Sequence, residues 1–573
     1  MVERGKYHEK KLLYVRFFLT LIILVIISLP LASCKNKTES NPTDPTSTNS
    51  SDTGETTMPT TNATTSNTGP ESKTDSTTTA KATIKNTDSK TTKQAITTNQ
   101  AEEDIYGKNY SVSGDKFYQK KTIYVTWVNV WHGSTETWFN GLAYSKYGTR
   151  IKIDGSSVVP DSNKSTHRKY IFEQAKNAGI NALVMDLTNG YNAWSLISKD
   201  YQRMCYENNM KFAVATHPKG ASDIEEICKF TWDTYVAPGK ALYASSYLYK
   251  NNKPLMVIYS TKNEYLSATG ANGTYKNKFE FVWASGEDSE PDKWGWQLEA
   301  QDGPIPSKDS MFITPAISWN SPRSSVDAWR NSMAFLDFGF LAAREINPKF
   351  VIVGSVDDTT EHNGWMTMDT SKKTYEMPTI SSNNLEIGLS YQIKDIYGKV
   401  SPSAYYDRVK QWITNGSVTA FNKNGILADG AYTLTNKASN KKFGVTRPAP
   451  QIKPATDLNA VFYRDYMLET KMETYYWFYH LGNNEYKIIK LSSGLALQPN
   501  ENGRLIQTWD ENTDKQRWII TRQSDGSYTI VNKATGTAIH DMANSDNTIY
   551  VKPKDDSVNQ KWDINPVPGR TIN

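Results

Sequence analysis

An internal repeat near the C-terminus constrains the fold more than any other feature of this chain. Three units open with a tyrosine and a short alternating run: YTLTNK, YKIIK and YTIVNK. They begin at Tyr432, Tyr486 and Tyr528. The second and third units close on Gln-any-Trp, at Trp518 and Trp562, which lie 44 residues apart, and Trp477 closes the first unit without the glutamine. Such strands cannot bury an apolar face alone, whereas three units around a pseudo-threefold axis can.

The Gln-any-Trp repeat resembles the ricin B-type β-trefoil lectin domain. The resemblance implies that residues 430–567 form a β-trefoil, with the tryptophans in its core and a sugar site in the outer cleft of each unit. The family places an aspartate in that cleft. The matching positions here hold Gly444, Gln498 and His540, with Asp541 adjacent to the last, so all three units depart from the family's pattern.

The second unit keeps the most of the implied sugar site. Its run Ile506-Gln507-Thr508-Trp509, followed by Asn512, resembles the stacking aromatic residue and polar partner of the family. We therefore expect the second unit to bind sugar and the third to offer a less complete site, and a trefoil that has lost sugar binding is the alternative. The expected binding residues are Gln498, Gln507, Trp509, Asn512, His540 and Tyr550.

Residues 115–425 alternate short apolar runs with helical patterns. Eight such runs within about 240 residues predict a closed (β/α)8 TIM barrel. Their residues are 123–128, 181–185, 211–216, 254–259, 279–283, 294–298, 311–315 and 350–353. The run 294–298 is brief and lacks a preceding helix. An open doubly wound sheet is the alternative, but no glycine-rich phosphate loop is found, which argues against a nucleotide cofactor.

The order of these elements resembles the barrels of retaining glycoside hydrolases, in the group around the endo-α-mannosidases and fungal α-1,3-glucanases. The resemblance covers about residues 118–413. It rests on the segments 175–182, 247–254, 294–296 and the region of Glu361. Relatives carry Asn-Glu-Trp and then Glu after the last strand, whereas this chain has DDTTE from Asp357, so only Glu361 carries over.

Acidic residues follow the predicted strands, and in a parallel barrel the strand ends meet at one rim. Glycoside cleavage needs two carboxyl groups, and the predicted catalytic residues are Glu361, Glu287 and Asp186. Other acids at strand ends are Glu299, Asp357 and Asp358. Aromatic rings stack on sugars and polar side chains bond their hydroxyls. The predicted binding residues in the barrel are Trp131, His132, His217, Trp296 and Trp365, with Asn129, Asn189, Trp283 and Trp319 as further candidates.

The N-terminus predicts export. Basic residues precede the apolar run 17–31, and the following Leu-Ala-Ser-Cys resembles the lipobox of bacterial lipoproteins, which implies a signal peptide at 1–33 and a lipid on Cys34. A plain signal peptide is the alternative. Residues 34–105 are rich in Ser, Thr and Asn and are expected to be a disordered linker, with a mean span of about 45 Å. We expect a bacterial cell-surface protein anchored to the membrane by its lipid.

Composition excludes several other classes. The net charge is +5, spread along the chain, so no nucleic-acid partner is expected, and with 3 Cys the chain is no disulfide scaffold. Cys205 and Cys228 are expected to be buried thiols, with a bridge as the alternative. No metal-ligand spacing is present. Two functions stand: an exported glycoside hydrolase targeted to polysaccharide by its lectin module, and a non-catalytic surface glycan-binding protein.

Overall fold

The computed structural model divides into two compact units, residues 1–91 and 92–573. The predicted signal peptide, Cys34 and the linker lie outside the residues that the structure describes. The described residues are 107, 110–130, 151–158, 160–284, 293–295, 307–314, 333–357, 364–367, 376–381, 384–390, 395–397, 399, 401–418, 424–444, 458–459, 474–491, 494–508, 510–542 and 549–572. Across these ranges no helix is long and apolar enough to cross a membrane.

A mainly parallel sheet organises the first half of the described chain. Its parallel strands are β1 (Ile123–Asn129), β4 (Ala182–Asp186), β5 (Lys211–Thr216), β7 (Lys253–Tyr259), β8 (Glu280–Ala284), β9 (Ser310–Ile313) and β10 (Phe350–Ser355). Their order in the sheet is β8-β7-β5-β4-β1-β10-β9, and the short β6 (Tyr249–Lys250) runs antiparallel beside β7. Each parallel strand except β8 therefore lies beside the parallel strand that follows it in the chain, and the last strand, β10, lies beside the first.

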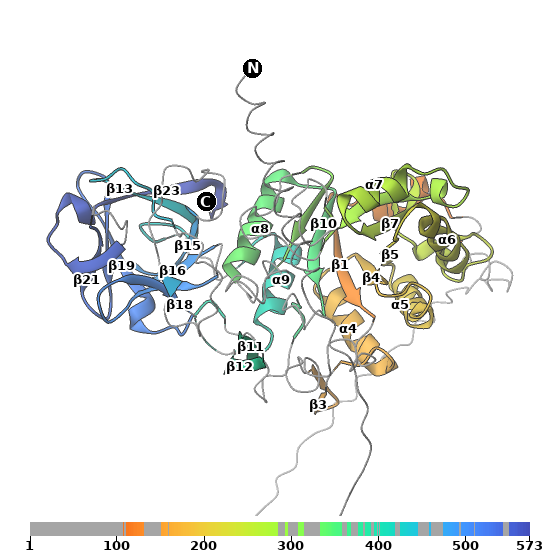
Figure 1. The fold of residues 1–573 in the computed structure, drawn as a ribbon, viewed down its shortest axis with the longest axis horizontal. Coiled ribbons are helices and arrows are strands. Elements are labelled where there is room, and N and C mark those ends of the chain that lie inside the picture. The colour runs from red at the N-terminus through yellow and green to blue at the C-terminus, as the bar shows by residue number, and fades with distance from the viewer. Residues whose placement is uncertain are drawn as a thin grey trace, which may run out of the picture. The chain divides into compact units, whose positions relative to one another are not determined.

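Helices flank this sheet, as their apolar faces require. They are α4 (Ser165–Asn177), α5 (Ser195–Glu207), α6 (Ala221–Thr231), α7 (Lys262–Gly270), α8 (Met333–Ile346) and α9 (Ala404–Asn415). In Figure 1, α8 and α9 lie beside β10, whereas α5, α6 and α7 lie at the end of the sheet that holds β5 and β7. Two hairpins lie outside the sheet: β2 (Ile151–Ile153) with β3 (Ser156–Val158), and β11 (Glu376–Ser381) with β12 (Asn384–Ser390).

Seven of the eight predicted strands are present in this sheet. The remaining one, 294–298, is described only at Trp294 and Gly295, where the amide of Trp294 donates to the carbonyl of Trp283 at 2.9 Å. No pairing joins β8 to β9 among the described residues. The described strands form a mixed half-barrel, and closure into a complete barrel is not shown.

Buried polar residues connect the helices beside β10. The carboxylate of Asp337 in α8 accepts hydrogen bonds from Arg408 in α9 at 2.8 and 2.9 Å, and from Trp412 and Tyr479 at 2.8 and 3.0 Å. Asp337 is fully buried, so these donors replace the water that its charge has lost. Elsewhere, Cys205 and Cys228 are buried and free, which decides between the two alternatives that the sequence left open.

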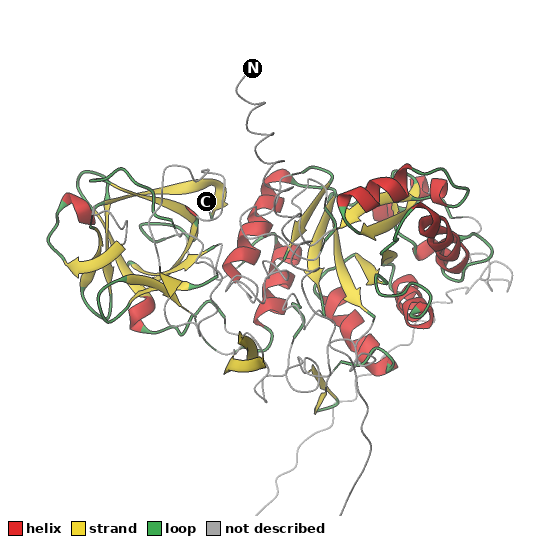
Figure 2. Cartoon of the chain, in the orientation of Figure 1, coloured by secondary structure: helices red, strands yellow, loops and turns green. Residues whose placement is uncertain are grey.

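The C-terminal region consists of strands and loops with short helical turns (Figure 2). Its strands are β13 (Gly430–Asn436), β14 (Leu458–Asn459), β15 (Tyr476–Gly482), β16 (Glu485–Lys490), β17 (Ala496–Pro499), β18 (Leu505–Thr508), β19 (Arg517–Arg522), β20 (Tyr528–Asn532), β21 (Thr537–Asp541), β22 (Ile549–Pro553) and β23 (Trp562–Thr571). They form one antiparallel sheet in which the three sequence units recur, as predicted for a β-trefoil.

The strand register corrects one detail of the repeat. The tyrosine that opens each unit pairs with the aromatic residue that closes a unit. These pairs are Tyr432 with Tyr476, Tyr486 with Trp518, and Tyr528 with Trp562. Tyr476 therefore takes the place of the closing tryptophan in the first unit, where the sequence pointed to Trp477. Since neighbouring residues of a strand face opposite sides, Trp477 packs in a different apolar cluster from Trp518 and Trp562.

The closing tryptophans and glutamines are structural. The indole nitrogens of Trp518 and Trp562 each donate at 3.1 Å, to the carbonyls of Leu497 and Ile539, and both rings are fully buried. Buried Gln516 donates to the hydroxyl of Thr508 at 2.9 Å and accepts from the amide of Glu511 at 2.8 Å. The repeated motif thus joins the strands of a unit and leaves recognition to other residues.

Candidate functional site

The packing of α8 identifies the inner face of the half-barrel. A Cβ on Gly339 of α8 would lie 2.8 Å from the side chain of Ile313 in β9, and Ile313 pairs with Val353 of β10. Side chains alternate along a strand, so Ile352 and its partner Val125 in β1 lie on the opposite face. This opposite, inner face points away from α8.

Asn129 and Asp186 lie together on this inner face, at the carboxyl ends of their strands. Asn129 lies four residues after Val125 in β1, so its side chain is on the same face of the sheet. It is in register with Asp186 of β4. Both residues are almost fully buried, with 3% and 7% of their surfaces exposed. The carboxylate of Asp186 accepts hydrogen bonds from the amide and hydroxyl of Thr188, at 3.1 and 2.6 Å, which orient it.

Asp357 completes the group from the other side of Asn129. It follows β10, it is fully buried, and its Oδ1 accepts from the amide of Asn129 at 2.9 Å and from the hydroxyl of Ser355 at 3.2 Å. Since β10 and β4 flank β1, the backbones that carry Asp357 and Asp186 are about 10 Å apart, or two strand spacings. Two carboxyl groups therefore flank one buried amide side chain.

The amide nitrogen of Asn129 is an unmet donor. Its Nδ2 is buried and has no hydrogen-bond partner among the described residues. Buried donors are almost always paired, because an unpaired one loses its hydration without compensation. An unmet donor between two carboxyl groups at the strand ends marks a place where a ligand or a water molecule would bind.

His217 and Trp365, both predicted to bind sugar, have different surroundings. His217 follows β5, is exposed, and its ring lies 5.5 Å from that of Tyr259. Trp365 is fully buried, donates to the carbonyl of Val353 at 3.1 Å and stacks on Tyr406. The prediction for Trp365 is corrected, because a core ring has no face open to a sugar.

Several predicted site residues cannot be placed. They lie outside the described residues, and they are Glu361, Glu287, Trp131, His132, Trp296 and Trp509. Of the predicted catalytic acids the structure therefore places Asp186. Asn129 is placed beside it, and Asp357, which the sequence offered only as one strand-end acid among several, is placed beside Asn129.

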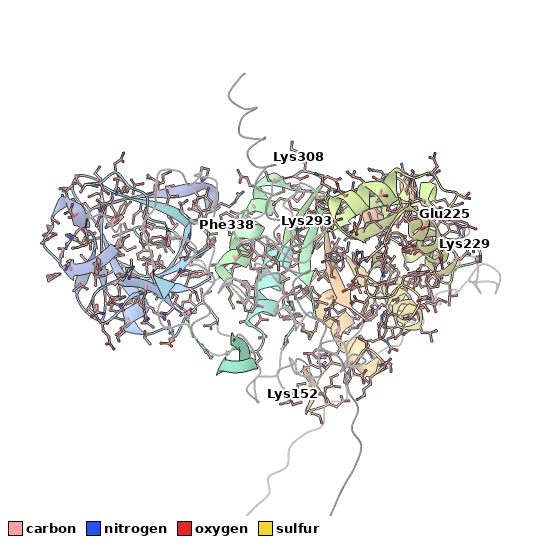
Figure 3. All side chains as sticks on the ribbon, viewed as in Figure 1. Lys152, Glu225, Lys229, Lys293, Lys308 and Phe338 are labelled. Carbon is pink, nitrogen blue, oxygen red and sulfur yellow. The ribbon has the colours of Figure 1, made fainter. Side chains whose placement is uncertain are left out.

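Other charged residues of the first half are structural. The carboxylate of Glu225 on α6 (Figure 3) accepts from the amides of Tyr275 and Lys276 at 2.8 and 2.9 Å, which fixes the segment after α7. Within the described ranges, no three His, Cys, Asp or Glu side chains are grouped as metal ligands.

A cavity of about 720 Å³ lies at the opposite end of the sheet, beside Lys211 at the start of β5. The ammonium group of Lys211 donates to the carbonyl of Ser245 at 2.8 Å and to the hydroxyl of Tyr110 at 3.2 Å. It also pairs with Asp115 at 2.5 Å. Burial lowers the pKa of Lys211, although Asp115 opposes the effect. Its contacts come from the chain itself, so this lysine holds the segment before β1 to the sheet.

In the trefoil, the register confirms which positions correspond between units. Bridges place Lys442, Ala496 and Ala538 at equivalent positions. Two residues later come Gly444, Gln498 and His540, the positions matched from the sequence.

The second and third units differ at these positions. Gln498 and His540 are half-buried, and they pair across the hairpin with Ile506 and Tyr550 respectively. Burial lowers the pKa of the His540 imidazole, which favours its neutral form. Asp541 is buried and accepts a hydrogen bond from the hydroxyl of Ser439, so it supports the fold.

Two further predicted residues frame the second unit. Gln507 is buried between β17 and the short β14, so its side chain is less open than expected. Asn512 has a left-handed φ of 55°, its amide donates to Asp510 at 3.0 Å, and its side-chain oxygen is buried without a partner among the described residues.

Comparison with known proteins agrees with the C-terminal fold. A family described as ricin-type β-trefoil lectin domain-like matches residues 474–552. The chain therefore contains a ricin-type lectin domain. No curated protein matches the chain.

Solved structures match about a quarter of the chain. The designed threefold symmetric protein ThreeFoil is 21% identical, with 24% of this chain and 99% of that chain covered and a TM-score of 0.21. An exo-β-1,3-galactanase from Clostridium thermocellum is 24% identical, with 24% and 30% covered and a TM-score of 0.21. A Polyporus squamosus lectin is 16% identical, with 25% and 50% covered and a TM-score of 0.21.

Proposed function

We propose that this protein is an exported, membrane-anchored glycoside hydrolase that binds polysaccharide through its trefoil and cleaves it at the strand ends of its α/β domain. The observation that carries the proposal is the ricin-type lectin domain on the same chain as a parallel sheet whose carboxyl ends gather acids. The alternative is a surface glycan-binding protein without catalysis.

The proposal includes a closed barrel. The indole of Trp127 in β1 donates to the carbonyl of Trp294 at 2.9 Å. The amide of Trp294 is hydrogen-bonded to Trp283 in β8, and β8 is separated from β1 by three strands in the sheet. The ring of Trp294 also lies 5.2 Å from that of Phe350 in β10. Such contacts across the inner face support curvature of the sheet toward closure, which residues 294–298 would complete as the eighth strand.

Cleavage of a glycosidic bond needs one protonated carboxyl group to give a proton to the leaving oxygen. A second, ionised carboxyl group acts as the nucleophile or activates water. We assign these two roles to Glu361 and Glu287, with Asp186 as the third candidate, because each follows a predicted strand. Burial favours the protonated form of a carboxyl group, and a polar environment favours the ionised form, so unlike surroundings separate the two roles.

The proposed location is the bacterial cell surface, with the lipid on Cys34 as the anchor. The linker 34–105 would hold the domains clear of the membrane. Replacing Cys34 by Ala should move the protein from the membrane fraction into the medium or the soluble fraction. Unchanged sedimentation with membranes would contradict the lipid anchor without bearing on catalysis.

The decisive test is the release of reducing ends from a panel of polysaccharides. We expect activity on at least one, and a loss of at least about a hundredfold in kcat when an acid that acts as proton donor or nucleophile is replaced by its amide. The variants are Glu361→Gln, Glu287→Gln and Asp186→Asn, with Asp233→Asn as a matched surface control. Binding without release of reducing ends from any polysaccharide would favour the alternative.

A further inference from the structure

The inner face of the half-barrel carries a group of polar residues that the trefoil match does not explain. We infer that Asn129, Asp186 and Asp357 form a binding site for one polyhydroxylated ring, separate from the trefoil clefts. In this site Nδ2 of Asn129 donates to an oxygen of the ligand, while the two carboxylates accept from its hydroxyl groups. The inference rests on the proposed function only for the ligand class, and it concerns binding.

The first argument is the unmet donor. Only 3% of the surface of Asn129 is exposed, and its Nδ2 has no hydrogen-bond partner among the described residues. An asparagine in such a place costs stability relative to an apolar residue of similar size. A donor present in spite of that cost is best explained by a partner other than the described residues.

The second argument is orientation. Asn129 and Asp186 are in register on adjacent parallel strands, so their side chains leave the sheet on the same face. Asp357 is held to the backbone of Asn129 by the 2.9 Å hydrogen bond to its Oδ1. Hydrogen bonds from Thr188 and Ser355 fix the two carboxyl groups further. The group is therefore preorganised, which lowers the entropic cost of binding.

The third argument concerns the ligand's chemistry. The nitrogen of an amide donates and does not ligate metals, so the unmet Nδ2 calls for an oxygen acceptor on the ligand. Within the described ranges no three His, Cys, Asp or Glu side chains form a group that could hold a metal ion. Two carboxylates and one amide donor suit a ligand that offers both hydroxyl protons and oxygen acceptors at close spacing. A sugar ring does so, and an iminosugar adds an ammonium group for the carboxylates.

The test measures binding of three iminosugars, deoxynojirimycin, deoxymannojirimycin and deoxygalactonojirimycin, to the full chain by isothermal titration calorimetry at neutral pH. We expect at least one to bind. Asn129→Leu removes the donor and keeps the branched shape of the side chain, and it should weaken binding about tenfold, the equivalent of one hydrogen bond. Its Tm should stay equal or rise, because the unmet donor is gone.

Two further variants separate this site from structural effects and from the trefoil. Asp186→Asn keeps the size and removes a charge that faces the ammonium group, so it should weaken binding by more than Asn129→Leu does. His540→Ala, in the trefoil, should leave iminosugar binding unchanged. If Asn129→Leu lowers the Tm, its loss of affinity could have a structural cause, and the affinity of Asp186→Asn for the iminosugar then tests the site.

The inference is overturned if no iminosugar binds at millimolar concentration, or if both Asn129→Leu and Asp186→Asn keep the wild-type affinity. Release of reducing ends is measured on the same preparations. Polysaccharide cleavage with no effect of the variants on iminosugar binding would leave the proposed function standing and remove this site. Iminosugar binding that depends on Asn129, without cleavage of any polysaccharide, would support this site and contradict the proposed hydrolase function.

Discussion

The trefoil and the half-barrel differ in which residues identify the fold and which identify a candidate site. In the trefoil, the Gln and Trp residues that close the second and third units are buried and hold the fold, whereas the cleft positions Gly444, Gln498 and His540 differ from unit to unit. In the half-barrel, the strands share only their apolar character, and the polar residues gather at one end of the sheet. A repeat therefore identifies a fold, while a cluster of unlike polar residues identifies a site.

The difference has a physical basis. Three equivalent units must present the same core residues to a common axis, so pseudo-symmetry repeats them. A ligand site in a parallel sheet is assembled once, from different strands, and needs a different residue from each. The predictions below test this contrast, from the largest expected effect to the smallest.

Trp562→Ala should lower the free energy of unfolding most, by roughly 3–5 kcal/mol, because it empties a fully buried indole volume and removes the 3.1 Å bond to Ile539. Denaturation by urea measures the loss. Trp283→Ala is the matched control in the half-barrel, where the half-buried ring donates to Ser260 at 3.1 Å, and it should cost less. Equal losses would contradict the view that the repeated residues carry the trefoil's stability.

Asp337→Asn should lower the free energy of unfolding by about 3 kcal/mol, because it leaves the buried guanidinium of Arg408 without a counter-charge. Thermal and chemical denaturation measure the effect. Asp233→Asn is the surface control: Asp233 pairs with the exposed Lys229 at 2.8 Å, and such pairs contribute less than about 1 kcal/mol. A loss at Asp337 no greater than that at Asp233 would show that the buried group adds nothing.

Gln498→Ala should weaken polysaccharide binding by about tenfold, since the second unit keeps most of the family's pattern and a lost hydrogen bond is worth about that factor. His540→Ala should weaken it less. Affinity gel electrophoresis measures both, and neither Tm should change much, because both side chains are half-buried at the cleft. The reverse ranking would assign sugar binding to the third unit.

Acidification should destabilise the fold slightly through His480. Both ring nitrogens are buried without a partner among the described residues, and burial lowers the pKa of this imidazole below its ordinary value of 6.5. The unfolded state then binds the proton more readily, so this contribution to stability is present above pH 6.5 and is lost as the pH falls toward the folded pKa.

The measurement is Tm against pH from 7 down to 5. His480→Gln should give a flatter profile than the wild type, because glutamine has no proton to gain over this range. The histidines at 167 and 540 have pKa values lowered in the same direction, so a residual slope is expected. Identical slopes for the wild type and His480→Gln would exclude His480 as a contributor.

Most strands could be predicted from the sequence, because a buried parallel strand is a short apolar run and the trefoil repeats its motif. The choice between Tyr476 and Trp477 could not be predicted. Both are aromatic and adjacent, and a shift of one residue changes the face to which a side chain belongs. The burial of Trp365 could not be predicted either, because an aromatic residue that follows a strand has the same sequence pattern in a core and in a cleft.

The sequence by itself determined the repeated units of the trefoil and seven strands of the sheet, because these follow from local periodicity. Only the tertiary structure decided that Asn129 lies between Asp186 and Asp357, and that its buried Nδ2 has no hydrogen-bond partner among the described residues. Burial and pairing are properties of contacts between residues distant in the chain, up to 228 positions apart for Asn129 and Asp357, and no local pattern encodes them.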